Sequence, residues 1–127
     1  MRRRSGPMAD RPRFEVVWTP PRFGWDTQGP VRYAEVVQDD VVIAYVWVSA
    51  DETAAGVVPR RRAGVAGDNA YVRWQARLAW ACGEAIKPLA ALRQWVGAPE
   101  ESDAGYIPAG SEREAPGLAA LRRFAGE

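Results

Sequence analysis

The stretch VRYAEVVQDDVVIAYVWV, which runs from Val31 to Val48, decides the fold of this 127-residue chain. Residues 31–37 and 41–48 are two runs rich in valine and aromatic side chains, and both have the length and composition of β-strands. Only Gln38-Asp39-Asp40 separates them, and a connection this short joins antiparallel neighbours. The stretch therefore predicts a β-hairpin at the centre of the fold.

The register of this hairpin stays open, because the turn lacks the glycine that would define its type. A two-residue turn would pair Arg32 with Trp47, whereas a three-residue turn would pair Tyr33 with Tyr45. Either register leaves residues 41–48 apolar on both faces, and a strand that is covered on both sides is central in its sheet. We expect a helix on one face and, on the other, either the aromatic-rich loop that precedes the hairpin or a partner protein.

A long helix that contains a proline is expected to supply the first cover. Asp68 or Asn69 can cap its start, because short polar side chains accept hydrogen bonds from the first free N–H groups. Pro88 interrupts the pattern and suits the first position of a new segment, so the element is a Pro-kinked helix or a helix pair that ends at Gly97. Its apolar stripe, spaced by three and four residues, comprises Tyr71, Trp74, Leu78, Ala81 and Ala85 before the proline and Leu89, Leu92, Trp95 and Val96 after it.

These elements predict an α+β fold: a small antiparallel sheet of three or four strands centred on the hairpin, packed by the long helix, with a short helix near the C-terminus. The further strands are expected at 14–18 and 55–58. The last helix has fewer than three turns, so it must dock on the body or on a partner to persist. The chain divides into a flexible basic arm (1–12), a single α+β domain (13–97), an acidic linker rich in Gly, Pro and Ser (98–115) and the C-terminal helix (116–125).

Composition excludes several classes of function. The chain has no histidine and one cysteine, Cys82, which rules out an internal disulfide, the usual Cys/His zinc sites and histidine-dependent nucleophilic catalysis. The longest apolar run has eight residues, far fewer than the roughly 20 of a membrane-spanning helix. No apolar core of a secretory signal follows the basic start, where Met8 is an alternative first residue. We expect a cytoplasmic protein without a membrane partner, and sixteen Arg against one Lys indicate a GC-rich bacterial genome.

A short pattern follows the expected strand at 55–58. It contains Arg61, Arg62, Gly64 and Ala66, and the spacing Arg61-x-x-Gly64-x-Ala66 resembles a loop of the GNAT family of N-acetyltransferases. In that family the backbone N–H groups of the loop and the next helix N-terminus hold the pyrophosphate of acyl-coenzyme A, and small residues let the backbone approach it. The resemblance covers about residues 31–83 and implies, as an alternative function, an acyl-CoA-binding or acetyltransferase-like protein that uses these four residues.

A nucleic-acid binder is a third interpretation. Arg60–Arg62, Arg73 and Arg77 could form a phosphate-binding surface together with the basic arm, and Trp80 could stack on bases. Proteins of this class are usually strongly basic, with an isoelectric point above about 9. This chain has a net charge of +1 and an isoelectric point near 7.9, so this interpretation is not favoured.

The surplus of aromatic residues carries the first hypothesis. Six Trp, four Tyr and three Phe are more than one small two-layer core needs, and exposed aromatic patches rimmed by arginine are typical of protein–protein contacts. We therefore expect a non-enzymatic interaction or regulatory module without a cofactor, whose partner is another protein or a second copy of the chain. The residues expected to form its binding surface are Tyr45, Trp47, Arg77 and Trp80.

Overall fold

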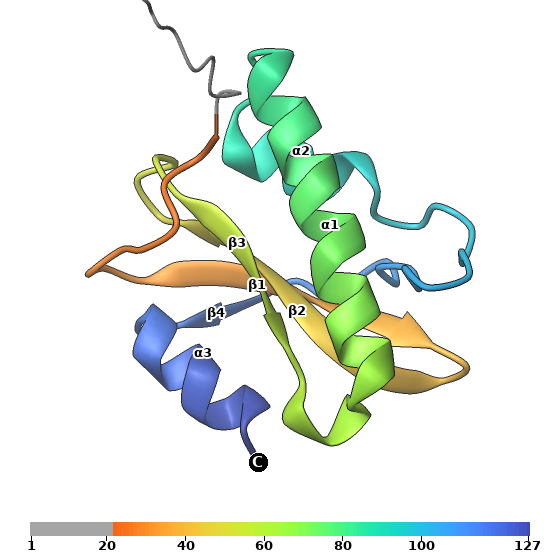
Figure 1. Ribbon diagram of the computed structural model, residues 1–127. Coiled ribbons are helices and arrows are strands. Elements are labelled where there is room, and N and C mark those ends of the chain that lie inside the picture. Colours follow the sequence, from red (N-terminus) through yellow and green to blue (C-terminus); the bar gives the residue numbers. More distant parts are fainter. Residues whose placement is uncertain (1–21) are drawn as a thin grey trace, which may run out of the picture.

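The sheet has four antiparallel strands in the computed structural model, which describes residues 22–127. Their order is β3-β2-β1-β4, so the hairpin lies at the centre and the two shorter strands lie at the edges (Figure 1). The predicted α+β class and the predicted strand at 55–58 are confirmed, whereas the strand expected at 14–18 lies outside the described residues. The strands are β1 (Val31–Gln38), β2 (Val41–Ser49), β3 (Ala55–Pro59) and β4 (Arg113–Ala115).

The hairpin keeps the register of a two-residue turn only beside the turn, where Gln38 pairs with Val41 and Val37 with Val42. Its turn has two residues, Asp39 and Asp40, both with positive φ (51° and 64°), as a type I′ turn requires. A bulge then shifts the pairing at Val36/Val37, so that Tyr33 lies opposite Trp47. A bulge adds one residue to one strand only, which a count of turn residues cannot include.

Strand β2 is central and buried on both faces, as expected. One face packs against α1 (Val65–Gly83) and α2 (Pro88–Gln94), where Trp74, Leu78 and Leu92 are buried. The opposite face packs against α3 (Leu118–Ala125). The second cover is therefore the C-terminal helix, and the expectation of the aromatic loop or a partner protein in this place was wrong.

Helix α1 begins earlier than expected, since its N-cap lies four residues before Asp68 and five before Asn69. Gly64 is the N-cap, and its φ of 55° lies in the region that glycine adopts without strain. Gly67 allows the close packing of this first turn on β2, since a Cβ atom there would lie 2.9 Å from the carbonyl oxygen of Ile43. The expected apolar stripe shifts accordingly: Tyr71 is exposed, and Gly67 and Ala70 are buried with Trp74, Leu78 and Ala81.

Of the two alternatives, a Pro-kinked helix or a helix pair, the structure has the pair. Ala85 has a positive φ of 61° between them, which ends α1. Pro88 is the first residue of α2, as predicted, because its missing N–H costs nothing at that position. A 3₁₀ turn, η2 (Arg61–Ala63), precedes α1, and α3 begins at Leu118, two residues after the expected Pro116.

The segment 98–115 is packed on the body and is not a linker. Ala104 and Ile107 are fully buried, and the Ala104 carbonyl oxygen accepts a 2.7 Å hydrogen bond from the indole N–H of Trp74. The backbone of Tyr106 exchanges hydrogen bonds of 2.8 and 2.9 Å with Val37. Its acidic, Gly- and Pro-rich composition suggested a linker, but backbone pairing and two apolar side chains are enough to anchor it.

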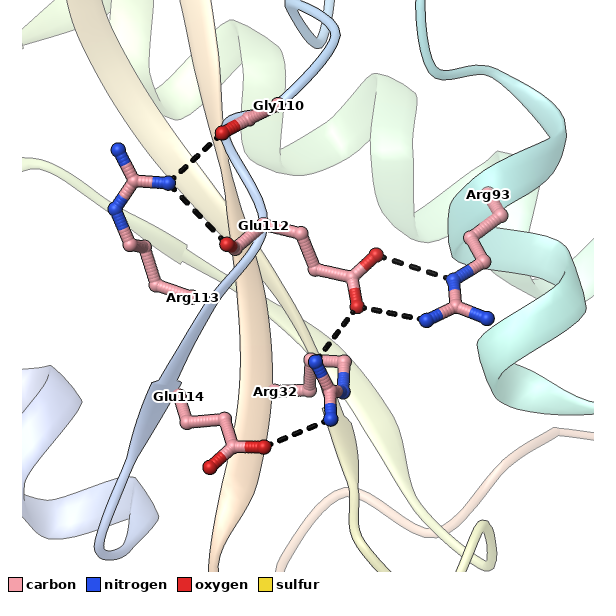
Figure 2. A network of polar contacts seen from close by, with 6 residues as sticks. All are labelled: Arg32, Arg93, Gly110, Glu112, Arg113 and Glu114. Carbon is pink, nitrogen blue, oxygen red and sulfur yellow. Dashed lines mark hydrogen bonds and ion pairs between the residues drawn. The ribbon is translucent and has the colours of Figure 1, made fainter.

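An ion-pair network fastens the end of this segment (Figure 2). The Glu112 carboxylate accepts hydrogen bonds from Arg93 on α2, at 2.9 and 3.1 Å, and from Arg32 on β1, at 2.9 Å. Arg32 also reaches Glu114, at 2.7 Å. The hydrogen bonds from Arg93 hold the pKa of the Glu112 carboxyl below its ordinary value. The network joins β4, β1 and α2.

Candidate functional site

The structure removes two of the expected partner-binding residues from the surface. Tyr45 and Trp47 are only 3% and 2% exposed, because α3 packs over them. The rings of Tyr45 and Phe124 on α3 lie 5.4 Å apart, and burial raises the pKa of the Tyr45 phenol. Both side chains therefore anchor α3, and neither presents a face that a partner could cover.

Arg77 and Trp80 lie together on the opposite side of the sheet. The Arg77 guanidinium stacks on the Trp74 ring, 4.4 Å from its centroid, and forms a 2.7 Å ion pair with Glu101. Trp80 is 50% exposed and packs edge-on against Trp95, with the ring centroids 6.1 Å apart. Arg77 thus has internal partners and ties α1 to the 98–107 loop, and Trp80 alone of the four expected residues presents a large exposed surface.

The expected anion-binding residues surround the start of α1. Arg61 and Arg62 are exposed on the 3₁₀ turn, Gly64 is exposed at the cap and Ala66 is half-buried. The structure therefore brings the four together. It also gives the glycines a role in the fold, since Gly64 makes the left-handed turn and Gly67 permits the packing on Ile43.

A groove that the sequence did not indicate runs along the free edge of β3. In the β2–β3 ladder, Ser49 donates to the Ala54 carbonyl and Arg60 to the Ile43 carbonyl, each at 2.9 Å. In an antiparallel pair, the backbone N–H and C=O groups of successive residues point alternately toward the neighbouring strand and away from it. Those of Gly56 and Val58 therefore point toward β2, and those of Ala55, Val57 and Pro59 point outward.

Val57 is the residue of β3 whose outward backbone groups lack a hydrogen-bond partner in residues 22–127. The outward N–H of Ala55 donates to the Gly24 carbonyl at 2.9 Å, and Pro59 has no N–H group. Within residues 22–127, the N–H and C=O of Val57 have no backbone partner. The side chain of Val57 is buried, but backbone groups that are left open on an edge strand can pair with a further extended segment.

Side chains from both covers form the walls of this edge groove, which has a volume of about 490 Å³. Strand β3 passes between α1 and α3 (Figure 1), so Tyr71 and Gln75 line one wall and Arg122 lines the other. The Gln75 amide donates to the Tyr71 hydroxyl at 3.4 Å. Trp25 stands at one end of the groove and is 79% exposed.

The floor of the edge groove explains one more glycine. A Cβ atom on Gly56 would lie 2.9 Å from the indole nitrogen of Trp47, so the glycine lets the buried tryptophan reach the strand. The sequence offered one signal for this site, which is an aromatic residue, Trp25, in a loop rich in Gly and Pro. Tyr71 was assigned to the core, because its spacing from Trp74 matched the apolar stripe.

Neither a metal site nor a membrane-spanning helix is found in residues 22–127. No group of three or more His, Cys, Asp or Glu side chains in this region is arranged to hold a metal ion. None of its helices combines the length and apolar character needed to cross a membrane. The candidate sites are the edge groove and the start of α1.

Comparison with known proteins assigns neither of them a role. No protein-family model matches the chain, and no curated protein or solved structure is significantly similar to it.

Proposed function

We propose that the protein is a non-enzymatic protein–protein interaction module that binds an extended peptide along the free edge of β3. The open N–H and C=O of Val57 inside a walled groove are the observation that carries this proposal. In strand addition, backbone hydrogen bonds provide affinity and pockets for alternate side chains provide specificity. A cytoplasmic setting is part of the proposal, in keeping with the single, free cysteine.

The walls define the chemistry of the peptide. Successive side chains of an added strand point to opposite faces, so one set would face Tyr71 and Gln75 and the other would face Arg122. Tyr71 and the exposed Trp25 favour an apolar or aromatic residue, while Arg122 favours an acidic one. Because Pro59 has no N–H group, the added ladder is short, and we expect weak, transient binding.

Selection from a displayed library of random peptides, followed by synthesis of the best binder, provides the test. Val57→Pro removes the outward N–H but no bond of the β2–β3 ladder. Because it also replaces a side chain that is buried in the core, its circular dichroism spectrum must first show that the fold is kept. We expect it to weaken binding at least tenfold, and Trp25→Ala and Tyr71→Ala to weaken it as well. The matched control is Trp80→Ala, an exposed aromatic residue outside the groove, which should bind with unchanged affinity.

Two outcomes would count against the proposal. One is a library that yields no binder, and the other is a binder whose affinity Val57→Pro leaves unchanged. Amide hydrogen exchange gives an independent measurement, because the Val57 N–H should exchange fast in the free protein and slowly in the complex.

The start of α1 supports a second candidate function, the binding of an anionic ligand such as acyl-CoA. Arg61 and Arg62 are exposed beside the N-terminal N–H groups of a 19-residue helix, which attract anions. Saturating acetyl-CoA at about 100 times its dissociation constant would add about 2.7 kcal/mol to the free energy of unfolding. That gain would raise the melting temperature by several degrees, and Arg61→Ala with Arg62→Ala should abolish the rise.

The same arginines allow a test of nucleic-acid binding. Affinity for DNA or RNA that depends on phosphate contacts falls steeply as the salt concentration rises. Binding that is insensitive to salt, or no binding at low salt, would dismiss this candidate.

A further inference from the structure

The outer face of α1 has an uncharged and mostly apolar stripe although it is directed away from the sheet. The buried side of the helix carries Trp74 and Leu78, and Figure 1 shows α1 as the outermost element on its side of the sheet. Val65 and Val72 on the outer side are 74% and 64% exposed. Residues three or four positions apart lie on the same side of a helix. From Val65 onward these positions form a stripe without a charged residue, which we call the outer stripe: Val65, Asn69, Val72, Ala76, Ala79 and Gly83.

The charged residues of α1 lie beside this outer stripe. Arg73 and Arg77 both point toward Glu101, with ion pairs of 3.4 and 2.7 Å, and Asp68 is the only other charged residue of the helix. An ordinary surface helix has its polar residues opposite the buried stripe, and a helix that is apolar on both sides is normally covered on both. Among residues 22–127, Phe23 and Trp25 share a pocket with Ala76 and Ala79, and the rest of the outer stripe is left for a second cover.

We propose that the outer stripe is covered by the same helix of a second copy, packed antiparallel around a two-fold axis. Such an interface is self-complementary, so every contact occurs twice. The outer stripe has large residues in its first half and small ones in its second half. Antiparallel packing centred on position 74 places Val65 opposite Gly83, Asn69 opposite Ala79 and Val72 opposite Ala76.

The charges at the two ends of α1 favour the same orientation. Arg61 and Arg62 precede the helix, and Glu84 follows it directly, with Lys87 three residues further on. Antiparallel packing brings Glu84 of each copy toward the arginines of the other, whereas Lys87 lies past the turn at Ala85 and caps α2, so it does not continue the α1 axis. Parallel packing would place the two arginine pairs side by side, which is unfavourable.

The size of the outer stripe sets the strength of the dimer. A 19-residue helix is about 28 Å long and about 10–12 Å wide, so the two stripes bury about 600 Å² in total. Trp80, half-exposed on the flank, can add to this area. Stable interfaces bury about 1,200–2,000 Å², and we therefore expect a weak dimer that forms as the concentration rises.

Sedimentation velocity of the full chain tests the proposal. Between roughly 5 µM and 500 µM, a range that brackets weak association, the mean mass of the wild type should rise toward that of a dimer. Val72 is 64% exposed in the monomer, so Val72→Arg should stay monomeric while keeping its circular dichroism spectrum. Ala119→Arg on the exposed side of α3 is the matched control and should associate like the wild type.

Mixing experiments test the position of the axis. In the proposed packing the two copies of residue 72 lie about 6 Å apart along the helix axis. Val72→Glu and Val72→Arg should each be monomeric alone and should form a heterodimer when mixed. Gly83→Val should weaken the dimer, because it meets Val65, and the double variant Val65→Ala/Gly83→Val should regain at least half of the lost association.

A distance measurement tests the orientation. Spin labels on Glu84→Cys in a Cys82→Ser background should lie about 30 Å apart along the axis in the antiparallel dimer, and side by side in a parallel one. A wild type that stays monomeric at the highest concentration would overturn the proposal, as would a dimer that Val72→Arg leaves intact. The inference is independent of the edge groove, since Val72→Arg should leave peptide binding unchanged.

Discussion

The two faces of β2 are covered by elements of very different size. On one face lies α1, which has 19 residues, with α2 beside it and the 98–107 loop packed against Trp74. On the other lies α3, which has eight residues and contributes Leu118, Leu121 and Ala125 to the core. A helix of eight residues does not persist alone in water, so its structure depends on docking against Tyr45 and Trp47. We infer that the α3 cover opens more easily than the α1 cover.

The largest effect is expected from Trp74→Ala, in the larger cover. The substitution removes a fully buried indole and its hydrogen bond to the Ala104 carbonyl, and losses of this type cost about 3–5 kcal/mol. Urea denaturation should show this decrease in the free energy of unfolding. Trp80→Ala on the same helix is the control and should cost about 1 kcal/mol, because half of its surface is exposed. Equal losses from the two variants would contradict the assigned roles.

A smaller effect is expected from Leu121→Ala, in the smaller cover. The buried side chain should contribute about 2 kcal/mol, the lower end for leucine, because the edge position lets the site collapse. Hydrogen exchange should show that the α3 amides lose protection while the central α1 amides keep theirs. Arg123→Ala, exposed on the same helix, should change neither. A uniform loss of protection over α1 and α3 would show that the two covers open together.

The smallest effect is expected from Glu112→Gln, in the network that fastens β4 between the covers. Partly exposed ion pairs contribute up to about 1 kcal/mol, and we expect a loss of this size at pH 7. The pKa of Glu112 is lowered in the folded protein, so its stabilisation is complete above the ordinary carboxyl pKa of 4.5 and disappears as the pH falls through the lowered value. The difference from the wild type should shrink accordingly.

Glu114→Gln is the control for this prediction. Glu114 contacts only Arg32 among the described residues and is mostly exposed, so its replacement should cost less than that of Glu112. A loss from Glu112→Gln that is the same at pH 3 and pH 7 would show that the ion pairs do not cause it.

The candidate sites could be predicted only in part. Clusters of arginine and glycine near 61–66 are visible in the sequence because they are contiguous. The edge groove combines Trp25, Val57, Tyr71 and Arg122, which lie far apart in the chain. The expectation that Tyr45 and Trp47 lie on the surface was wrong, because the residues that bury them come some seventy positions later, in α3.

The sequence by itself determined the hairpin, the strand at 55–58, the start of α2 at Pro88 and the α+β class. These features follow from β-propensity, from the fixed φ of proline and from apolar spacing, which all act over a few residues. The tertiary structure decided the bulge at Val36/Val37, the docking of α3, the burial of Ile107 and the open edge at Val57. These depend on the apolar surface and backbone groups that remain unsatisfied once the local elements have formed, and only segments distant in the chain can cover them.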